Sequence, residues 1–287
     1  MKLPERCYIC LYEKYSRRHP RDVDEQTLAA YQSEVAQTIE QHKDKSSPQI
    51  VEHINRLRVA YFGGIEEYGA IKRYFNQYML EREASMQAAV DASDDPLATA
   101  VRYAMAGNLI DFGAFPTVEE DTLRAFLDAA QRTALDETAL QRLRTELACA
   151  RRLCYMTDNC GEIVADKVLL RTLRRLYPSL TVTVLVRGAP IHNDATREDA
   201  EQVDLMSVTD AIADSGCAIG GIVPDRLPAD AAKAFLDADV RIAKGQGNYE
   251  TLSGCAFPIH FIFLCKCPMF TERFGVAPCT GLLIKEG

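Results

Sequence analysis

The sequence has 287 residues, which is enough for one large domain or two smaller ones. Its 33 Lys and Arg residues and 41 Asp and Glu residues give a formal net charge of −8. This charge argues against a broad nucleic-acid-binding face, because such faces need clustered Lys and Arg. The hydrophobic content of 47% and the charged content of 26% are typical of a globular chain.

No apolar run approaches the ~18 residues that a membrane helix needs, and we expect no membrane association. The first residues lack the apolar stretch of a secretory signal. We therefore expect a cytoplasmic protein in which most of the 10 cysteines are reduced thiols packed as small hydrophobic side chains.

Up to about residue 150 the sequence has the periodicity of helices. Apolar residues recur at spacings of three and four, as they do on the buried face of a helix. Asp95 before Pro96 is typical of a helix start, and Gly107 with Asn108 is typical of a helix end. Helices are predicted over residues 26–40, 50–61, 96–106 and 123–147, the last with a break near Leu135 and Asp136.

After residue 150, apolar runs alternate with helical patterns. Strands are predicted over residues 153–156, 181–187, 217–223, 240–244, 259–265 and 280–285, and helices over residues 162–176, 196–203 and 228–236. This alternation predicts an α/β fold with a mostly parallel sheet that is covered on both faces. We therefore expect a helical N-terminal region over residues 1–150 and an α/β domain over residues 151–287.

The carboxyl ends of parallel strands deliver their loops to one edge of the sheet, where ligands bind. The loops after the first, second and fourth predicted strands carry Asp158, Asn159 and Glu162, then Arg187, Asn193 and Asp194, then Lys244, Asn248 and Glu250. Hard oxygen ligands suit Mg²⁺ or Mn²⁺, and Lys or Arg beside such a metal suits a phosphate. Helix N-termini after Gly161 and Gly247 could donate further N–H groups to an anion.

Asp158 and Asp194 are also ordinary helix caps or turn residues. On the residues alone, the sequence therefore predicts an anion site or a metal-and-anion site, and helix capping remains an alternative.

Four blocks carry a resemblance to a known family. They are Gly-Asn-Leu-Ile-Asp at 107–111, Asp-Asn-Cys-Gly-Glu at 158–162, Arg-Gly-Ala-Pro-Ile-His-Asn-Asp-Ala-Thr at 187–196 and Lys-Gly-Gln-Gly-Asn-Tyr-Glu at 244–250. These blocks resemble, in the same order, the signature blocks of the DUF89 family, whose members are also called ARMT1-like or damage-control phosphatases. The early Cys7-x-x-Cys10 resembles the start of the compact prokaryotic subgroup.

The resemblance implies a metal-dependent phosphatase that acts on small phosphorylated metabolites such as sugar phosphates. It implies a Rossmann-like α/β/α sandwich preceded by a helical N-terminal region. The family's metal ligands fall on Asp158, Asn159 and Asp194, which would hold a divalent cation (Mg²⁺, Mn²⁺, Co²⁺ or Ni²⁺). Its phosphate-binding Lys falls on Lys244, and Asn108 and Asp111 match a block near the site.

We assign the remaining roles as a hypothesis. A water attacks phosphorus in line, and Asp111 or Glu162 orients it or assists proton transfer. Direct attack by Asp158 to give an aspartyl-phosphate is an alternative, although a carboxylate committed to a metal is a poorer nucleophile. The residues assigned to the substrate phosphate are Lys244, Asn108, Arg187, Asn193, Gly161 and Asn248.

Other functions remain open. A carboxyl methyltransferase that uses S-adenosylmethionine (SAM) would need a Gly-rich loop after the first strand, where this sequence has only Gly161. A non-catalytic protein could bind a phosphometabolite without releasing phosphate. Cys7-x-x-Cys10 could belong to a zinc site completed by Cys265-x-Cys267 or Cys279, or to a redox site, but a lone Cys-x-x-Cys is a weak signal.

Overall fold

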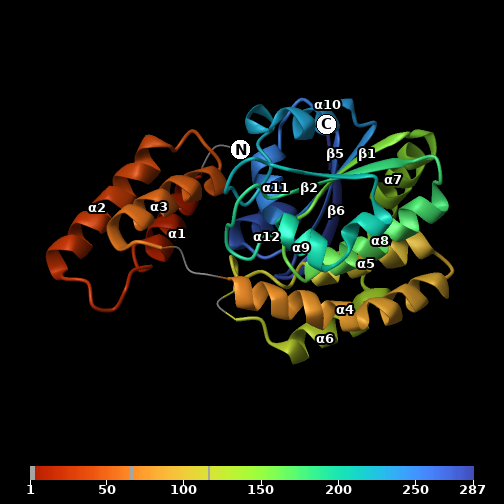
Figure 1. Ribbon diagram of the computed structural model, residues 1–287, viewed down its shortest axis with the longest axis horizontal. Helices are drawn as coiled ribbons and strands as arrows, with labels where there is room; N and C mark the ends of the chain where they lie inside the picture. Colours follow the sequence, from red (N-terminus) through yellow and green to blue (C-terminus); the bar gives the residue numbers. More distant parts are fainter. Residues whose placement is uncertain (1–3, 65–67, 116) are drawn as a thin grey trace.

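The computed structural model describes residues 4–64, 68–115 and 117–287, and within them six strands form one sheet. The sheet order is β3-β2-β1-β4-β5-β6 (Figure 1). Five strands are parallel: β1 (Arg152–Met156), β2 (Thr181–Val186), β3 (Ala211–Asp214), β4 (Val240–Lys244) and β5 (Ile259–Cys265). The last strand, β6 (Thr280–Glu286), runs antiparallel to β5. The predicted α/β fold with a mostly parallel sheet is confirmed.

Side chains alternate along each strand, so both faces of the sheet carry apolar side chains. Helices cover both of these faces. In β1, Leu153 and Tyr155 join the core that contains α4 (Gly69–Asp91), α5 (Pro96–Gly107) and α8 (Glu162–Leu176). Cys154 and Met156 face the opposite core, which contains α10 (Ala229–Asp237), α11 (Gly245–Leu252) and α12 (Pro268–Phe274). The central strands are therefore buried on both sides, as in other parallel sheets.

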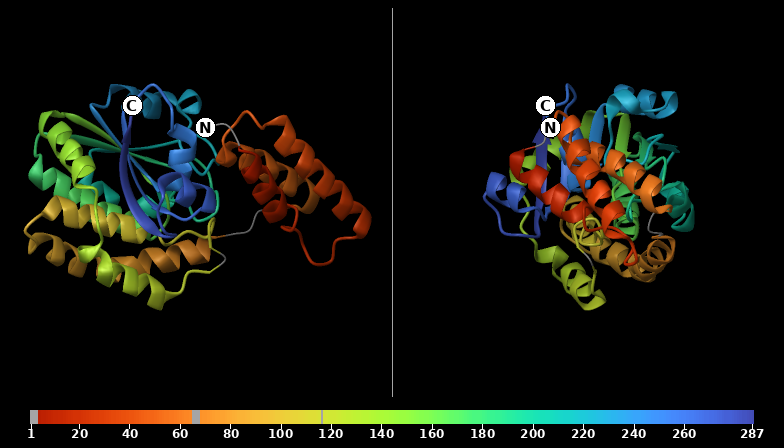
Figure 2. Two further views of the ribbon diagram at one scale, coloured as in Figure 1. Left: turned by 180° about the vertical axis from the view of Figure 1, so that it is seen from behind. Right: turned by 90° about the vertical axis from the view of Figure 1, so that its left-hand side faces the viewer.

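The first three helices form a separate lobe. α1 (Glu5–Tyr15), α2 (Glu25–Gln41) and α3 (Ser47–Phe62) pack around their own core. Figures 1 and 2 show this lobe beside α11 and α12, with its longest helix pointing away from the sheet. Polar contacts attach it to the larger part of the molecule, including Glu52 of α3, which accepts hydrogen bonds from Arg226 at 2.6 and 3.0 Å. Ile191, from the loop after β2, packs into the lobe's core.

The helices between this lobe and the sheet belong to the packing of the sheet. α5 packs on α8, and both α6 (Glu120–Ala129) and α7 (Glu137–Cys149) contribute leucines to the core that contains β1. The short helix η1 (Ala130–Arg132) and the following loop separate α6 from α7, so the predicted break near Leu135 is confirmed. The division of the chain into domains at residue 150 stays a prediction.

The prediction of a third strand over residues 217–223 is wrong. The strand is β3, four residues with Asp at its end, and the apolar run that follows it is loop. Ile219 and Ile222 are buried by packing, not by pairing in the sheet. A Cβ on Gly221 would lie 2.6 Å from the Gly247 carbonyl oxygen. The backbone of this segment therefore approaches the start of α11 so closely that a residue with a side chain would clash there.

Most other predicted elements are confirmed within a few residues, including α8 and β4 at their predicted bounds. The helix predicted over 196–203 is α9 (Arg197–Gln202), and it is followed by the short helices η2 (Leu205–Val208) and η3 (Pro224–Arg226). α11 begins at Gly245, three residues before the expected helix start after Gly247. No helix of the described residues combines the length and apolar character needed to cross a membrane.

The core on the α10 side of the sheet predicts the effect of truncating its aromatic side chains. Phe235 is fully buried and packs against the ring of Phe257 with centroids 5.3 Å apart. We expect Phe235→Ala to lower the free energy of unfolding by about 3–5 kcal/mol, because it leaves a cavity that neighbours fill only partly. Urea denaturation measures the loss. Leu236→Ala on the same helix is the control, because Leu236 is 53% exposed, and an equal loss in both variants would contradict the packing described.

Candidate functional site

The candidate site lies where β1 and β4 end side by side. Strands that follow β1 extend the sheet on one side and those that follow β4 extend it on the other, which makes this a topological switch point. The loop after β1 and the loop after β2 are joined here by backbone hydrogen bonds. Cys160 N donates to Asn193 O at 2.8 Å, and Ala195 N donates to Asp158 O at 2.7 Å. These bonds bring the predicted ligands Asp158, Asn159 and Asp194 together.

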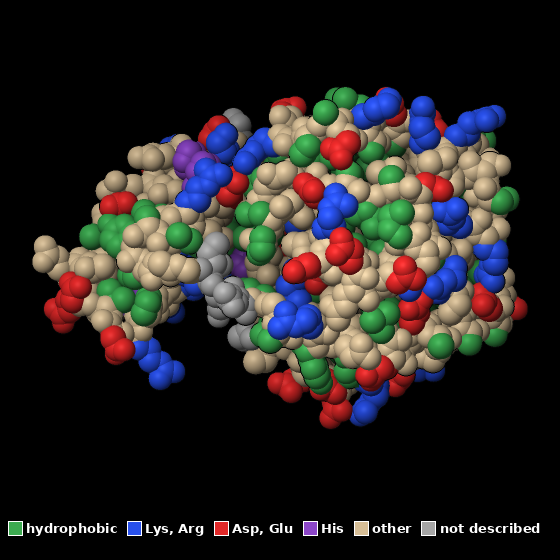
Figure 3. Space-filling view, viewed as in Figure 1, with side chains coloured by type: hydrophobic (Ala, Val, Ile, Leu, Met, Phe, Trp, Pro, Cys, Tyr) green, Lys and Arg blue, Asp and Glu red, His purple; other side chains and the backbone are tan. Residues whose placement is uncertain are grey.

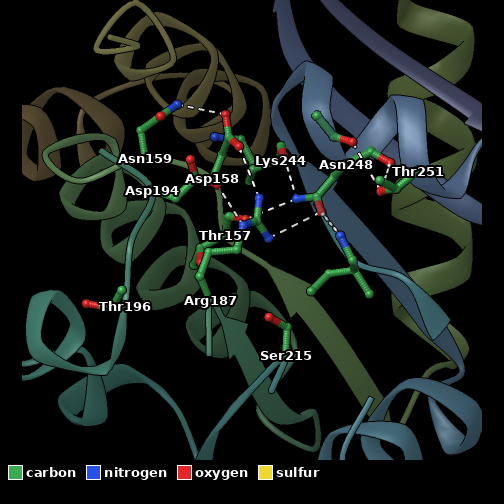
Figure 4. Close-up of polar contacts among 12 residues, drawn as sticks. Thr157, Asp158, Asn159, Arg187, Asp194, Thr196, Ser215, Lys244, Asn248 and Thr251 are labelled. Atoms are coloured by element: carbon green, nitrogen blue, oxygen red, sulfur yellow. Dashed lines mark hydrogen bonds and ion pairs between the residues drawn. The ribbon is translucent and has the colours of Figure 1, made fainter. Parts of the chain in front are cut away.

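Arg187 connects two of these acids. Its Nε lies 2.7 Å from Asp194 Oδ2, and its Nη2 lies 3.2 Å from Asp158 Oδ1. Figure 4 shows the guanidinium between Asp158 and Asn248, whose Oδ1 accepts a hydrogen bond from Arg187 Nη1 at 3.4 Å. The Arg187 side chain is fully buried, so it neutralises acids inside the protein.

The acids of this cluster have raised pKa values. Burial, followed by the charges of Glu162 and Asp194, raises the pKa of Asp158 well above its ordinary value. Burial also raises the pKa of Asp194 to about 6, although the Arg187 charge opposes the shift. A second positive charge near these two carboxylates would therefore stabilise their ionised forms.

The amide of Asn159 is oriented by the same cluster. Its Nδ2 donates to Asp158 Oδ2 at 2.7 Å and to Glu162 Oε2 at 3.0 Å. Asn108 Nδ2 donates to the same two oxygens at 3.1 and 2.8 Å. Among the described residues no hydrogen-bond donor contacts Asn159 Oδ1 or Asp194 Oδ1, so both oxygens remain available.

This donor set fits a hard divalent cation. Two carboxylates and an amide line the same cavity, and such oxygen ligands suit Mg²⁺ or Mn²⁺. Gly245 permits the close approach of Asp158, because a Cβ there would lie 1.9 Å from Asp158 Oδ2. Over residues 4–64, 68–115 and 117–287, no group of three or more His, Cys, Asp and Glu side chains is arranged to hold a metal, so an ion here would need the Asn159 amide. The same finding leaves the zinc alternative for Cys7 and Cys10 without a ligand set among these residues.

Lys244 lies beneath this cluster and is fully buried. Its ammonium donates to Glu162 Oε1, to Asp166 Oδ1 at 2.8 Å and to Ala104 O at 2.9 Å. Burial acts to lower the pKa of Lys244, but the charges of Asp166 and Glu162 outweigh it and raise the pKa. All three ammonium hydrogens therefore have protein partners.

The other residues assigned to the phosphate also make internal contacts. Asn193 holds the 107–111 block: its Nδ2 donates to Ile110 O and its Oδ1 accepts from Phe112 N, both at 2.9 Å. Asn248 Nδ2 donates to Thr157 O at 3.0 Å, which ties α11 to the end of β1. Gly161 has a positive φ of 66°, and its N–H donates to Asn76 Oδ1 at 2.6 Å.

A cavity of about 470 Å³ opens in front of the acids. Asp158, Asn159, Asp194 and the predicted catalytic residue Asp111 line it. Glu162 and the six residues assigned to phosphate binding do not appear among the described residues of its wall, so their direct roles stay predictions. Figure 3 shows a groove on the surface between the α1–α3 lobe and the larger part of the molecule.

Sequence reasoning missed the wall that the first helix supplies. Lys14 and Tyr15 of α1 line the cavity, and so does Lys266, which follows β5. Tyr15 OH lies 3.2 Å from Nε2 of His192, which also lines the cavity. Lys266 Nζ lies 2.8 Å from Asp111 Oδ2. Burial acts to raise the pKa of Asp111, but the Lys266 charge and the hydrogen bonds from Lys266 and the Ala114 backbone together outweigh it and lower the pKa. The available signal was Cys7-x-x-Cys10, which resembles the family's start and whose cysteines both lie on this wall.

Comparison with known proteins identifies the family. A model described as the damage-control phosphatase ARMT1-like domain matches residues 3–279. The chain belongs to this family. The resemblance found in the four sequence blocks is therefore confirmed.

Relatives match over most of their length. A damage-control phosphatase of Archaeoglobus fulgidus is 32% identical over 281 residues, which cover 96% of each chain. A damage-control phosphatase of Pyrococcus horikoshii is 32% identical over 209 residues, covering 70% of this chain and 71% of the relative. The crystal structure of a DUF89 family protein from Pyrococcus horikoshii superposes with a TM-score of 0.82 at 23% identity, covering 100% of both chains, and supports the same fold.

The contacts of Lys244 predict a structural effect that is independent of any substrate. Lys244→Met removes the cation that faces Glu162 and Asp166, and both acids have fully buried side chains. We expect the free energy of unfolding to fall by about 3–5 kcal/mol, because a buried charge loses its partner. Urea denaturation at neutral pH tests this. Lys233→Met is the control, since Lys233 pairs with Asp237 on the surface and should contribute below about 1 kcal/mol. A similarly small loss for Lys244→Met would show that the buried pair does not support the fold.

Proposed function

We propose that the protein is a metal-dependent phosphatase that hydrolyses phosphomonoesters of small metabolites, such as sugar phosphates or related damaged metabolites. The observation that carries this proposal is the placement of Asp158, Asn159 and Asp194 on the wall of one cavity. The cavity volume of about 470 Å³ lies in the range of small-molecule sites and leaves room for a leaving group beside a phosphate. Relatives that match most of the chain are named damage-control phosphatases.

The cation would be held by Asp158, Asn159 and Asp194. Their oxygens are hard donors, which favours Mg²⁺, Mn²⁺, Co²⁺ or Ni²⁺ in an oxygen-rich site. When bound, a divalent cation polarises the phosphate and neutralises charge that develops during transfer.

The chain's own residues divide the remaining tasks. A water attacks phosphorus, the bond to the ester oxygen breaks, and that oxygen takes up a proton. Asp111 lines the cavity with its pKa lowered, so it is ionised and suited to accept a hydrogen bond from the attacking water. Glu162 has an indirect role, because it accepts hydrogen bonds from Asn159 and Lys244 and so orients both side chains. Arg187 keeps the Asp158 and Asp194 carboxylates in position.

A methyltransferase is less well supported by the same site. The turn after β1 has only Gly161, and the chain leaves β2 through Arg187, where a bound nucleoside would need an acidic residue. Phosphate release, measured as follows, separates a phosphatase from a methyltransferase and from a protein that only binds phosphometabolites.

Substitution of the ligand carboxylates should abolish phosphate release. A panel of phosphorylated metabolites is assayed for inorganic phosphate with each of the four metals, then with EDTA, then after metal is restored. We expect activity to disappear with EDTA and to return with metal. Asp158→Ala or Asp194→Ala should lower kcat/KM by at least about 100-fold, the upper range for losses around a metal site. Asp237→Ala, on the exposed face of α10, is the control. Full activity in either ligand variant would refute the assignment.

Metal binding should also be measurable without turnover. A ligand that binds only the folded state at 100 times its Kd raises the free energy of unfolding by about 2.7 kcal/mol. We expect thermal and urea unfolding of the wild type to show this stabilisation with Mn²⁺, and Asp194→Asn to lose most of it. Asp214→Asn is the control, because Asp214 pairs with Arg197 outside the cavity. Equal stabilisation of the wild type and Asp194→Asn would place the ion elsewhere.

A further inference from the structure

The α1 wall of the cavity carries a lysine whose ammonium bonds a backbone carbonyl oxygen. The Lys14 ammonium lines the cavity and donates to the Gly113 carbonyl oxygen. Among the described residues no carboxylate forms an ion pair with Lys14, whereas Lys266 on the same cavity pairs with Asp111 at 2.8 Å. Lys14 therefore brings positive charge to the cavity that no ion pair with a described residue neutralises, although the charges of Asp111 and Glu250 still act on it.

Burial and a neighbouring cation make the charged form of Lys14 less favourable. Its ammonium lies 5.7 Å from the centre of the Tyr15 ring, and the Arg18 guanidinium lies 5.2 Å from the same ring. Burial and then the Arg18 charge lower the pKa of Lys14. An anion beside the Lys14 ammonium would offset both of these unfavourable contributions.

Among the described residues, the acids that line this cavity form no ion pair with Lys14, although the charges of Asp111 and Glu250 partly stabilise it. Asp111 is engaged by Lys266, as described above. Glu250 accepts a hydrogen bond from Gln246 at 3.1 Å. Asp158 and Asp194 lie with Arg187 at the sheet edge. The cavity therefore has two different regions: oxygen donors at the sheet and a cation on α1.

We propose that Lys14 binds a second anionic group, a carboxylate or a phosphate, on the part of the substrate that leaves. This inference rests on the proposed phosphatase function and narrows its substrate class to phosphomonoesters that carry a further acidic group. The phosphate to be hydrolysed lies at Asp158, Asn159 and Asp194, and the rest of the molecule extends through the cavity to α1. Lys14 is a specificity-determining residue in this arrangement and takes no part in bond breaking.

Three probes test the proposal in the presence of Mg²⁺. Glucose 6-phosphate has an uncharged leaving group, 6-phosphogluconate adds a carboxylate, and glucose 1,6-bisphosphate adds a phosphate. For the wild type we expect kcat/KM to be at least about tenfold higher for one or both of the doubly anionic probes, which is the lower range for a hydrogen bond to a charged group. The doubly anionic probe whose kcat/KM exceeds that of glucose 6-phosphate shows whether the subsite binds a carboxylate, a phosphate or both.

Variants of Lys14 separate charge recognition from folding. Lys14→Met should lose this preference, mainly through KM, because its kcat/KM should fall more for the doubly anionic probes than for glucose 6-phosphate. Lys14→Arg should retain most of it. Lys43→Met is the matched control, because Lys43 lies in the same lobe, pairs with Glu40 on the surface and is not on the cavity wall. Circular dichroism and urea unfolding check that each variant is folded, and Lys14→Gln replaces Lys14→Met if that variant is not.

The outcomes distinguish failure of the subsite from failure of the proposed function. A wild type without preference, or an equal loss for all three probes in Lys14→Met, overturns the subsite even when phosphate is released. If no probe is hydrolysed, the phosphatase proposal fails for these compounds, and dissociation constants from isothermal titration calorimetry replace kcat/KM. A preference in those constants that disappears in Lys14→Met still supports the subsite, and its absence overturns it.

Discussion

The structure depends on the burial of several acids at the carboxyl end of the sheet. Asp158, Glu162, Asp166 and Asp194 are buried there, and within the described chain they contact two buried cations, Lys244 and Arg187. Burying a charge is unfavourable unless an opposite charge and hydrogen bonds compensate it. Each cation therefore bridges two acids, and the geometry of the site follows from these two bridges together with the amides of Asn108 and Asn159.

The excess of acids also explains why the cluster suits a cation. Burial is the main cause of the raised pKa values of Asp158 and Asp194, and Arg187 offsets it only in part. The same two carboxylates face the cavity, whereas Glu162 and Asp166 face Lys244 inside the protein. All four acids thus have an internal cation, but only Asp158 and Asp194 also line the cavity, where an ion from solution can reach them.

Local sequence predicted the parts of the fold that local physics controls. The predicted bounds are confirmed for β4, β5 and α8. The continuous apolar runs of the two strands match burial on both faces of the sheet, and the spacing of apolar residues in α8 matches burial of a helix face. Asp158 and Asp194 were predicted to meet because each follows a strand of one parallel sheet. The run at 217–223 misled the prediction, because its apolar side chains are buried by loop packing against α11, and packing between distant segments leaves no period in a sequence.

The roles of the polar motif residues were harder to predict for a related reason. Lys244, Arg187, Asn193 and Asn248 are residue types that bind phosphate, and their spacing indicates a common location but gives no direction for their side chains. In the structure they point into the protein, where they hold the loops that carry Asp158 and Asp194. A motif block can therefore identify a site while leaving open which of its members contact a ligand.

The cavity has two walls of different origin. One wall is fixed by the sheet, and the other belongs to the α1–α3 lobe. Asp158, Asn159 and Asp194 are fixed by the sheet and by backbone bonds between two loops. Lys14 and Tyr15 come from a lobe with its own core, and polar contacts such as Glu52 with Arg226 attach that lobe to the sheet. Ile191 belongs to both parts, because it packs in the lobe's core three positions before Asp194. Residues that recognise the rest of a substrate can therefore differ between relatives at α1 without disturbing the acids, provided that the contact made by Ile191 is kept.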